Sequence, residues 1–176
     1  MEIERAIRTR RAIRKYDQER SVSDDVLYQI LEAGRLGPSS KNSQPVRFVV
    51  VRDKDKILKL SEMTYTGGYL PSASVAVAVI TKDAKLPEID AARAVQNMVL
   101  RAWDLGVGTC WITNFWEKGL ELLGVPMNGR YRLITVLPFG YPHPDVSKPK
   151  GKRLRKSLDE VVSYETLGNP WTREEQ

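Results

Sequence analysis

The chain has 176 residues, of which 41% are hydrophobic and 28% charged. This is the balance of a folded domain, and it excludes an intrinsically disordered chain. The length fits a single domain, residues 1–176, with a core large enough to stand alone. The net charge of +6 permits nucleic acid, phosphate or an anionic cofactor as partner, without choosing among them.

Cysteine content and apolar runs limit where the protein works. Cys110 is the only cysteine, so no disulfide can form within the chain, and a reducing compartment is expected. One cysteine and one histidine, His143, are too few for a structural zinc site, and no metal is predicted. The N-terminus does not resemble a secretory peptide, and no apolar run reaches the roughly 18 residues of a membrane span. We therefore expect a cytoplasmic protein with no membrane partner.

Helices alternate with short apolar strands along the chain. In order, the pattern predicts a helix at 23–34, a strand at 47–51, a helix at 54–62, a strand at 74–80, a helix at 90–105, a strand at 108–113, a helix at 117–124 and a strand at 131–142. Such alternation indicates an α/β or α+β fold. Residues 163–176 are predicted to form a loosely ordered C-terminal tail.

Two of these helices carry clear boundary signals. Ser23 is a predicted N-cap, and Gly34 and Gly37, followed by Pro38, end the first helix. Asp90 is the predicted cap of the helix at 90–105, whose apolar surface is broad enough to be covered on more than one side. We therefore expect this second helix to be central.

The segment TRRAIRKY, residues 9–16, gathers four cations around two apolar residues. Ala12 and Ile13 can anchor it while the guanidinium groups beside them point to one side. Those groups belong to Arg10, Arg11 and Arg14. A second basic segment repeats the design, because Arg153 and Arg155 flank Leu154 and would share one face of an extended strand.

Either cluster alone is as readily explained as a solvated face. Arginine rather than lysine, however, favours bidentate recognition of phosphate. Neither a P-loop nor the glycine pattern of a dinucleotide-binding turn accompanies the clusters, so side chains would have to hold any phosphate.

The loop PSSKNSQP, Pro38 to Pro45, is the second unusual feature. Its simplest interpretation is a plain connection from helix to strand. It also offers hydroxyls, two amides and a lysine between two prolines, and could present them to a polar aromatic ring. Two reactive residues elsewhere are weaker candidates for a catalytic role. His143 has no catalytic partner nearby in the sequence, and Cys110 lies in an apolar strand, as an inert core thiol does.

Five segments occur in a fixed order: RRAIRKY, LEAGRLGPSSKNSQPVRFVVV, AVQNMVLRAWDLGVGTCWI, LPFGYP and a basic stretch before SLDEVV. In this order and at these spacings the chain resembles the nitroreductase family of FMN flavoproteins over essentially its whole length. The family pattern commonly begins RRSxR. Here Ala12 stands at the serine position, which removes one hydroxyl from the expected phosphate site and leaves the arginines to compensate.

The resemblance implies an α+β sandwich: a mixed, mainly antiparallel central sheet flanked by helices, in a homodimer with FMN at the subunit interface. It implies three groups of cofactor-binding residues. The phosphate group and nearby ring edge would meet Arg10, Arg11, Ala12, Arg14, Arg153 and Arg155. The loop reaching the flavin from the partner subunit would supply Pro38, Ser39, Ser40, Asn42 and Gln44. The segment against the ring, where a backbone N–H can bond flavin N5, would be Trp111, Ile112, Thr113 and Asn114.

The resemblance further implies an FMN-dependent oxidoreductase. Hydride would pass from NADH or NADPH to flavin N5, and then to a nitro compound, quinone or similar small oxidant in ping-pong turnover. No side chain would act as catalytic acid or base, because the flavin carries the chemistry.

Two alternatives remain at this stage. A basic nucleic-acid-binding module would stack bases on Tyr16, Tyr65, Tyr69 and Trp116, but these aromatics are not interleaved with the cations, so no nucleic-acid partner is expected. A specialised flavoenzyme of the same fold, such as a dehalogenase or a flavin-fragmenting enzyme, would need an added lid for which this chain has little room.

Overall fold

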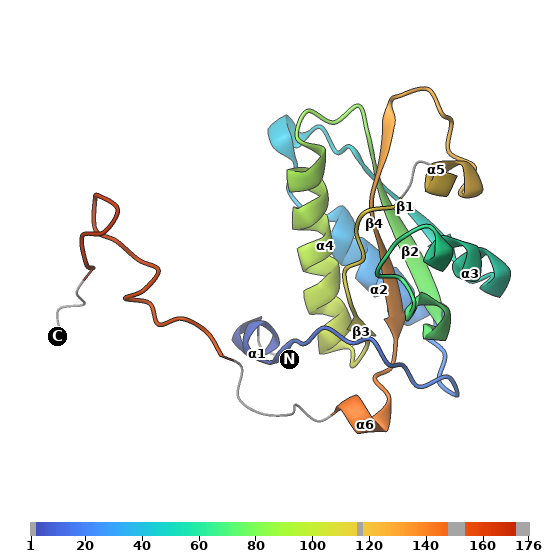
Figure 1. Ribbon diagram of the computed structural model, residues 1–176, viewed down its shortest axis with the longest axis horizontal. Helices are drawn as coiled ribbons and strands as arrows, with labels where there is room; N and C mark the ends of the chain where they lie inside the picture. The colour runs from blue at the N-terminus through green and yellow to red at the C-terminus, as the bar shows by residue number, and fades with distance from the viewer. Residues whose placement is uncertain (1–2, 116–117, 148–153, 172–176) are drawn as a thin grey trace.

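The computed structural model describes residues 3–115, 118–147 and 154–171, and Figure 1 shows its arrangement. The helices are α1 (Ile3–Thr9), α2 (Asp24–Arg35), α3 (Lys54–Glu62), α4 (Pro87–Asp104), α5 (Lys118–Leu122) and α6 (Pro144–Ser147). The strands are β1 (Val46–Val51), β2 (Val75–Lys82), β3 (Gly108–Thr109) and β4 (Tyr131–Gly140). Two short 3-10 turns, η1 (Ser40–Asn42) and η2 (Leu70–Ser72), complete the described elements.

The four strands form one sheet in the order β1-β2-β4-β3, and each neighbouring pair is antiparallel. In register, Val49 faces Ala78 and Val77 faces Leu137. A parallel bridge between Ala12 and Thr109 adds the N-terminal segment beside β3. The α+β fold with a mixed, mainly antiparallel sheet is therefore confirmed.

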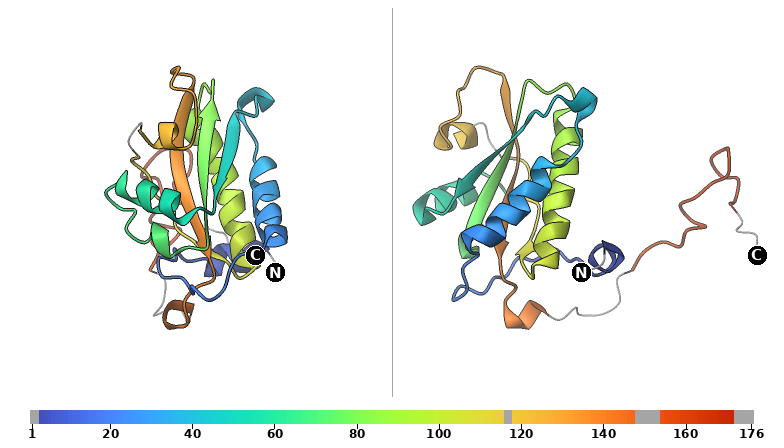
Figure 2. Two further views of the ribbon diagram at one scale, coloured as in Figure 1. Left: turned by 90° about the vertical axis from the view of Figure 1, so that its right-hand side faces the viewer. Right: turned by 180° about the vertical axis from the view of Figure 1, so that it is seen from behind.

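Helices cover both faces of the sheet, α2 with α4 on one side and α3 with α5 on the other, as the left view of Figure 2 shows. Because successive strand residues point to opposite faces, β2 supplies both layers of the core and is buried along almost its whole length. Val75, Val77 and Val79 pack toward α2 and α4, while Ala76 and Ala78 pack toward α3. This explains why the sequence of β2 shows no polar alternation.

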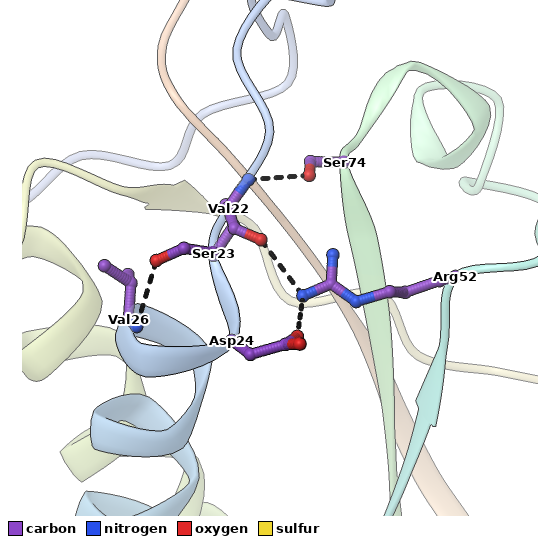
Figure 3. Close-up of polar contacts among 6 residues, drawn as sticks. All are labelled: Val22, Ser23, Asp24, Val26, Arg52 and Ser74. Carbon is purple, nitrogen blue, oxygen red and sulfur yellow. Dashed lines mark hydrogen bonds and ion pairs between the residues drawn. The ribbon is translucent and has the colours of Figure 1, made fainter.

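The start of α2 is fixed to the sheet by polar contacts, drawn in Figure 3. The Ser23 hydroxyl accepts from the Val26 amide at 3.4 Å, which confirms the predicted cap. Arg52, directly after β1, donates to the Val22 carbonyl (3.0 Å) and to the Asp24 carboxylate (2.7 Å). The Val22 amide donates to the Ser74 hydroxyl (2.8 Å), just before β2. The chain entering α2 is thus held against the ends of two strands.

Some predicted boundaries were wrong. Asp90 is not the cap of α4, because the helix starts one turn earlier with Pro87 as its first residue, a position that proline favours. The predicted strand at 108–113 is regular only over Gly108–Thr109, with a further isolated bridge from Ile112 to Val136. The sequence analysis also missed α1, whose single buried residue, Ala6, gives it little apolar periodicity.

Every helix in the described part of the chain is too short or too polar to cross a lipid bilayer.

Candidate functional site

The arginine segment lies against β3. The Ile13 amide donates to the Thr109 carbonyl at 3.0 Å, and the Ile13 side chain covers Gly108, where an added Cβ would lie 2.6 Å from it. Ile13 is buried, whereas Ala12 is exposed, so of these two only Ile13 is an anchor, and the expected anchoring role of Ala12 was wrong. Alternation along this extended stretch leaves Ala12 and Arg14 on the solvent side.

Arg11 turns back toward α1. Its Nη1 donates to the carbonyls of Thr9 (2.9 Å) and Arg10 (3.1 Å), next to the last turn of the helix, and makes a longer bond of 3.3 Å to the Arg8 carbonyl. Carbonyls at a helix C-terminus lack partners within the helix, and a cation there is favourable. Arg11 therefore stabilises the end of α1, beside Arg10, which is half-buried.

Arg14 lies beside Tyr69 and Cys110. Its guanidinium carbon is 5.8 Å from the centroid of the Tyr69 ring, a cation–π distance. The pKa of Arg14 is raised, chiefly by the neighbouring Cys110 thiol. The pKa of Tyr69 is raised as well, first by burial and then by its contact with Cys110, so Tyr69 stays neutral beside a permanently charged Arg14.

The segment Trp111–Asn114 continues directly from β3. Ile112 is fully buried, and its carbonyl accepts from the Thr135 hydroxyl at 2.7 Å. Its neighbours Trp111 and Thr113 are exposed, as expected for alternate residues of an extended chain. The Thr113 carbonyl accepts from the Thr64 hydroxyl at 2.9 Å, which ties the loop after α3 to this segment. Asn114 has a left-handed backbone with φ of 61°.

The N-terminal part of the first predicted group and the whole of the segment predicted to lie against the ring therefore come close within one chain. Arg10, Arg11, Ala12 and Arg14 lie on one side of β3, and Trp111–Asn114 follow from its end. A cleft of about 570 Å³ opens beside Arg14, lined among others by Tyr16, Asp17, Tyr69 and His143. Within this cleft, Arg14 and the neutral Tyr69 are the groups that suit an anionic, aromatic ligand.

The third group lies elsewhere. In Figure 1 the loop from Pro38 to Gln44, which includes Ser39, Ser40 and Asn42, is at the end of α4 where that helix begins, and the arginine segment is at the other end. The 18 residues of α4 separate them by about 27 Å. One chain does not bring this loop to the arginines.

The second basic cluster is also remote. Arg153 lies outside the described residues. Arg155 is exposed, and its Nη1 donates to the Leu154 carbonyl at 3.0 Å. Figure 1 shows the described part of this C-terminal segment extending away from the body of the fold. Within one chain the structure therefore does not join Arg155 to the arginines of residues 10–14.

Sequence reasoning missed several residues that hold the site together. Tyr69 and Thr64 both belong to the stretch TYTGGY, where a pair of glycines between tyrosines was a usable signal of a shaped loop. Trp103, near the end of α4, donates from its indole N–H to the Thr9 hydroxyl at 2.9 Å, a contact that no local pattern indicates. Among the described residues, no three His, Cys, Asp or Glu side chains gather as a metal site would require.

Comparison with known proteins gives a consistent result. The sequence model of the nitroreductase family matches residues 7–70 and 81–141. A protein of Archaeoglobus fulgidus, provisionally named NADH dehydrogenase/NAD(P)H nitroreductase, is 39% identical over 77% of this chain and 83% of its own length.

Two solved structures have the same fold. One is a provisionally named nitroreductase from Desulfovibrio desulfuricans in complex with FMN: 30% identity, a TM-score of 0.82, and coverage of 98% of this chain and 99% of that one. The other is an FMN-dependent nitroreductase from Clostridium difficile: 29% identity, a TM-score of 0.79, and coverage of 92% and 98%.

Proposed function

Because this chain belongs to the nitroreductase family, we propose that it is an FMN-dependent oxidoreductase that works as a homodimer. The proposed reaction takes hydride from NADH or NADPH and delivers it to a nitro compound, a quinone or a similar small oxidant, in two successive half-reactions. When bound, FMN supplies the hydride-accepting and hydride-donating chemistry. The unpaired Cys110 supports a reducing compartment, and we place the enzyme in the cytoplasm.

The observation that carries the proposal is the bridge between Ala12 and Thr109. It holds the arginines next to the start of Trp111–Asn114, the two groups that would meet the phosphate end and the ring of one cofactor. The guanidinium groups of the arginines can each bind a phosphate dianion through two N–H groups. Trp111 and Thr113, which are exposed on one side of their segment, can lie against a flat ring. All three Arg11 bonds use Nη1, and an arginine has further N–H groups to offer an anion.

The residues present therefore fit the cofactor. Arg10, Arg11 and Arg14 would bind its anionic and polar edge. Trp111 and Thr113, on the exposed side of the segment, would lie toward the ring and exclude water from it. Tyr69 would keep the Arg14 guanidinium in place through its ring. A fixed positive charge beside the flavin would favour its anionic reduced form. None of these roles requires a side chain to give or take a proton.

The distance between the loop and the arginines supports a shared site. A loop that offers hydroxyls and amides but lies a helix length away can reach the cofactor only from a second subunit. The described C-terminal segment also exposes large apolar side chains, among them Leu154, Leu158, Val161 and Leu167. Apolar groups exposed in this density are typical of a surface that another chain covers. Both observations favour the homodimer.

Cofactor binding tests the proposal. Purified protein incubated with FMN and then desalted should keep the flavin's visible absorption band, and should oxidise NADH or NADPH when a nitroaromatic compound or quinone is present. A panel of oxidants with both nicotinamides would identify the preferred pair. A protein that stays colourless and instead binds DNA in a strongly salt-dependent way would contradict the proposal and favour a nucleic-acid-binding module.

A further inference from the structure

The end of α2 and the loop that follows it, which is proposed to reach the flavin, contact α4 at regularly spaced positions. Gly34 packs on Met98, and Gly37 packs on Ala94, where an added Cβ would lie 2.7 Å and 2.8 Å from the nearest atoms. Three residues further along the loop, the Ser40 amide donates to Asp90 Oδ1 at 2.9 Å. Gly34, Gly37 and Ser40 are thus three residues apart, and their partners Met98, Ala94 and Asp90 are four residues apart, about one turn of α4 each.

Asp90 differs from the other contacts because it is charged and buried, with 1% of its surface exposed. Its Oδ1 accepts the Ser40 amide and lies 3.6 Å from Arg93 Nη1. Its Oδ2 has no hydrogen-bond partner within the described residues. Burying a carboxylate is costly, and one amide hydrogen bond with one long ion pair returns only part of that cost. Asp90 is therefore poorly explained as a stabilising residue.

The loop beside it has an unusual backbone. Lys41, Asn42 and Gln44 all have positive φ, at 53°, 53° and 47°, a conformation that residues other than glycine seldom adopt. Such a backbone persists only where surrounding contacts impose it. Within the loop, the Asn42 and Ser43 amides donate to the Ser39 and Ser40 carbonyls, and the Gln44 amide donates to the Ser39 hydroxyl at 2.9 Å. Arg47, on β1, donates to the Gln44 carbonyl at 2.8 Å. The Asp90 bond to Ser40, immediately before the first of these residues, ties the turn to α4.

We propose that Asp90 is a positioning residue for flavin binding. Its carboxylate fixes the Ser40 amide, imposes the left-handed turn at Lys41 and Asn42, and so sets the direction in which the loop presents Asn42 and Gln44. This inference rests on the proposed function, in which the loop contacts the flavin of the partner subunit. The inference adds Asp90 to the flavin site as a buried residue that contacts the loop and does not touch the ligand itself.

Three variants test the inference by FMN titration of the apoprotein. Asp90→Ala removes the acceptor and should weaken FMN binding about tenfold to a hundredfold, the range of a lost hydrogen bond to a charged group. Asp90→Asn keeps an oxygen that can accept the Ser40 amide, and should stay within about threefold of the wild type. Glu88→Ala, the control, removes an exposed acid of the same helix, one paired with Arg132, and should leave affinity unchanged.

Hydrogen exchange of the apoprotein provides a readout that needs no flavin. The amides of Asn42 and Ser43, which donate to the Ser39 and Ser40 carbonyls, should exchange faster in Asp90→Ala and at the wild-type rate in Asp90→Asn and Glu88→Ala. Equal exchange and equal FMN affinity in the wild type and Asp90→Ala would overturn the inference. So would an Asp90→Asn variant as impaired as Asp90→Ala, since the bond to Ser40 would then not matter. A wild-type protein that takes up no FMN would instead refute the proposed function.

Discussion

The Tyr16 hydroxyl donates a hydrogen bond to the Ile13 carbonyl, 2.7 Å away, and both side chains are buried. The bond closes a turn whose outer side carries Arg14 and Lys15, which are exposed. The arginine segment is therefore held at Ile13 and Tyr16, on both sides of the residue proposed to meet the flavin edge.

Stability should fall at alkaline pH because of Tyr16. Burial is the main cause that raises the pKa of Tyr16 well above its ordinary value near 10. The native state thus favours the neutral hydroxyl. Its contribution is fully present below about pH 10, and it is lost as pH rises from there toward the native pKa. Chemical denaturation between pH 8 and pH 11 should show the decline.

Tyr16→Phe separates this effect from the other tyrosines. At pH 8 the variant should be about 0.5–1.5 kcal/mol less stable, because the Ile13 carbonyl loses its partner. Above pH 10 the difference should shrink, since phenylalanine cannot ionise. Tyr28→Phe, on an exposed face of α2, should follow the wild type throughout. A constant difference between Tyr16→Phe and wild type at every pH would argue against Tyr16.

Removing an arginine from either basic cluster should weaken FMN binding. Arg10→Ala or Arg155→Ala should cost about 1.5–3 kcal/mol for each charged hydrogen bond lost, or about tenfold to a hundredfold in Kd. Titration followed by flavin fluorescence measures this. Arg5→Ala removes the same charge from an exposed position of α1 and should have little effect. Unchanged affinity in both test variants would exclude the arginine clamp.

Steady-state kinetics should show that the hydride donor and the oxidant use one face of the flavin in turn. If hydride donor and oxidant occupy the same place successively, initial rates measured at several oxidant concentrations should give parallel double-reciprocal lines. Intersecting lines would mean that both substrates are bound together, and would require a second pocket.

Gly37→Ala should destabilise the fold where the loop leaves α2. Its new Cβ would lie 2.8 Å from the backbone Cα of Ala94, so α4 or the loop must move, at about 1–3 kcal/mol. Gly68→Ala is the matched control, because no atom lies within 4 Å of its added Cβ, and its effect should stay under about 1 kcal/mol. Equal melting temperatures for the two variants would show that the packing of α2 on α4 tolerates a methyl group.

Mixed dimers test the shared site. A chain carrying Asn42→Ala is paired with one carrying Arg10→Ala. If the loop and the arginines of each site come from different subunits, one site loses both contributions and the other keeps both. About half of the sites should then bind FMN normally. Two equally weakened sites per dimer would show that each chain builds its own pocket.

The sequence predicted best where local chemistry decides the structure. The valine-rich runs at β1 and β2 were recognised because both strands are rich in β-branched residues, and α3 matched its predicted range because its apolar positions repeat at helical spacing. The end of α2 was also found, but for an incomplete reason. Gly34 and Gly37 do more than stop a helix, since each allows α4 to approach more closely than a side chain would permit.

It was less complete where side-chain contacts, helix starts or distant pairing decide the structure. Asp90 looked like a helix cap, the ordinary place for an aspartate before an apolar run, but Pro87 starts the helix earlier and leaves Asp90 inside the packing. Arg11 was expected to face an anion, and this stays a prediction; no local pattern indicated that its Nη1 also bonds the carbonyls at the end of α1. The meeting of the arginine segment with β3 depends on a backbone pairing between residues far apart in sequence, which no local pattern encodes.

That pairing also sets when the site can form during synthesis. The arginine segment is among the first parts of the chain to be made, but its partners come late: Thr109 for Ile13, Tyr141 for Asp17, and Asp145, 130 residues on, for Lys15. At ribosomal speeds this interval is on the order of ten seconds. For most of it the arginines have no β3 to dock on. If these arginines hold the flavin as proposed, a nascent or prematurely terminated chain cannot capture it, and flavin loading is confined to chains that have already been translated past β4.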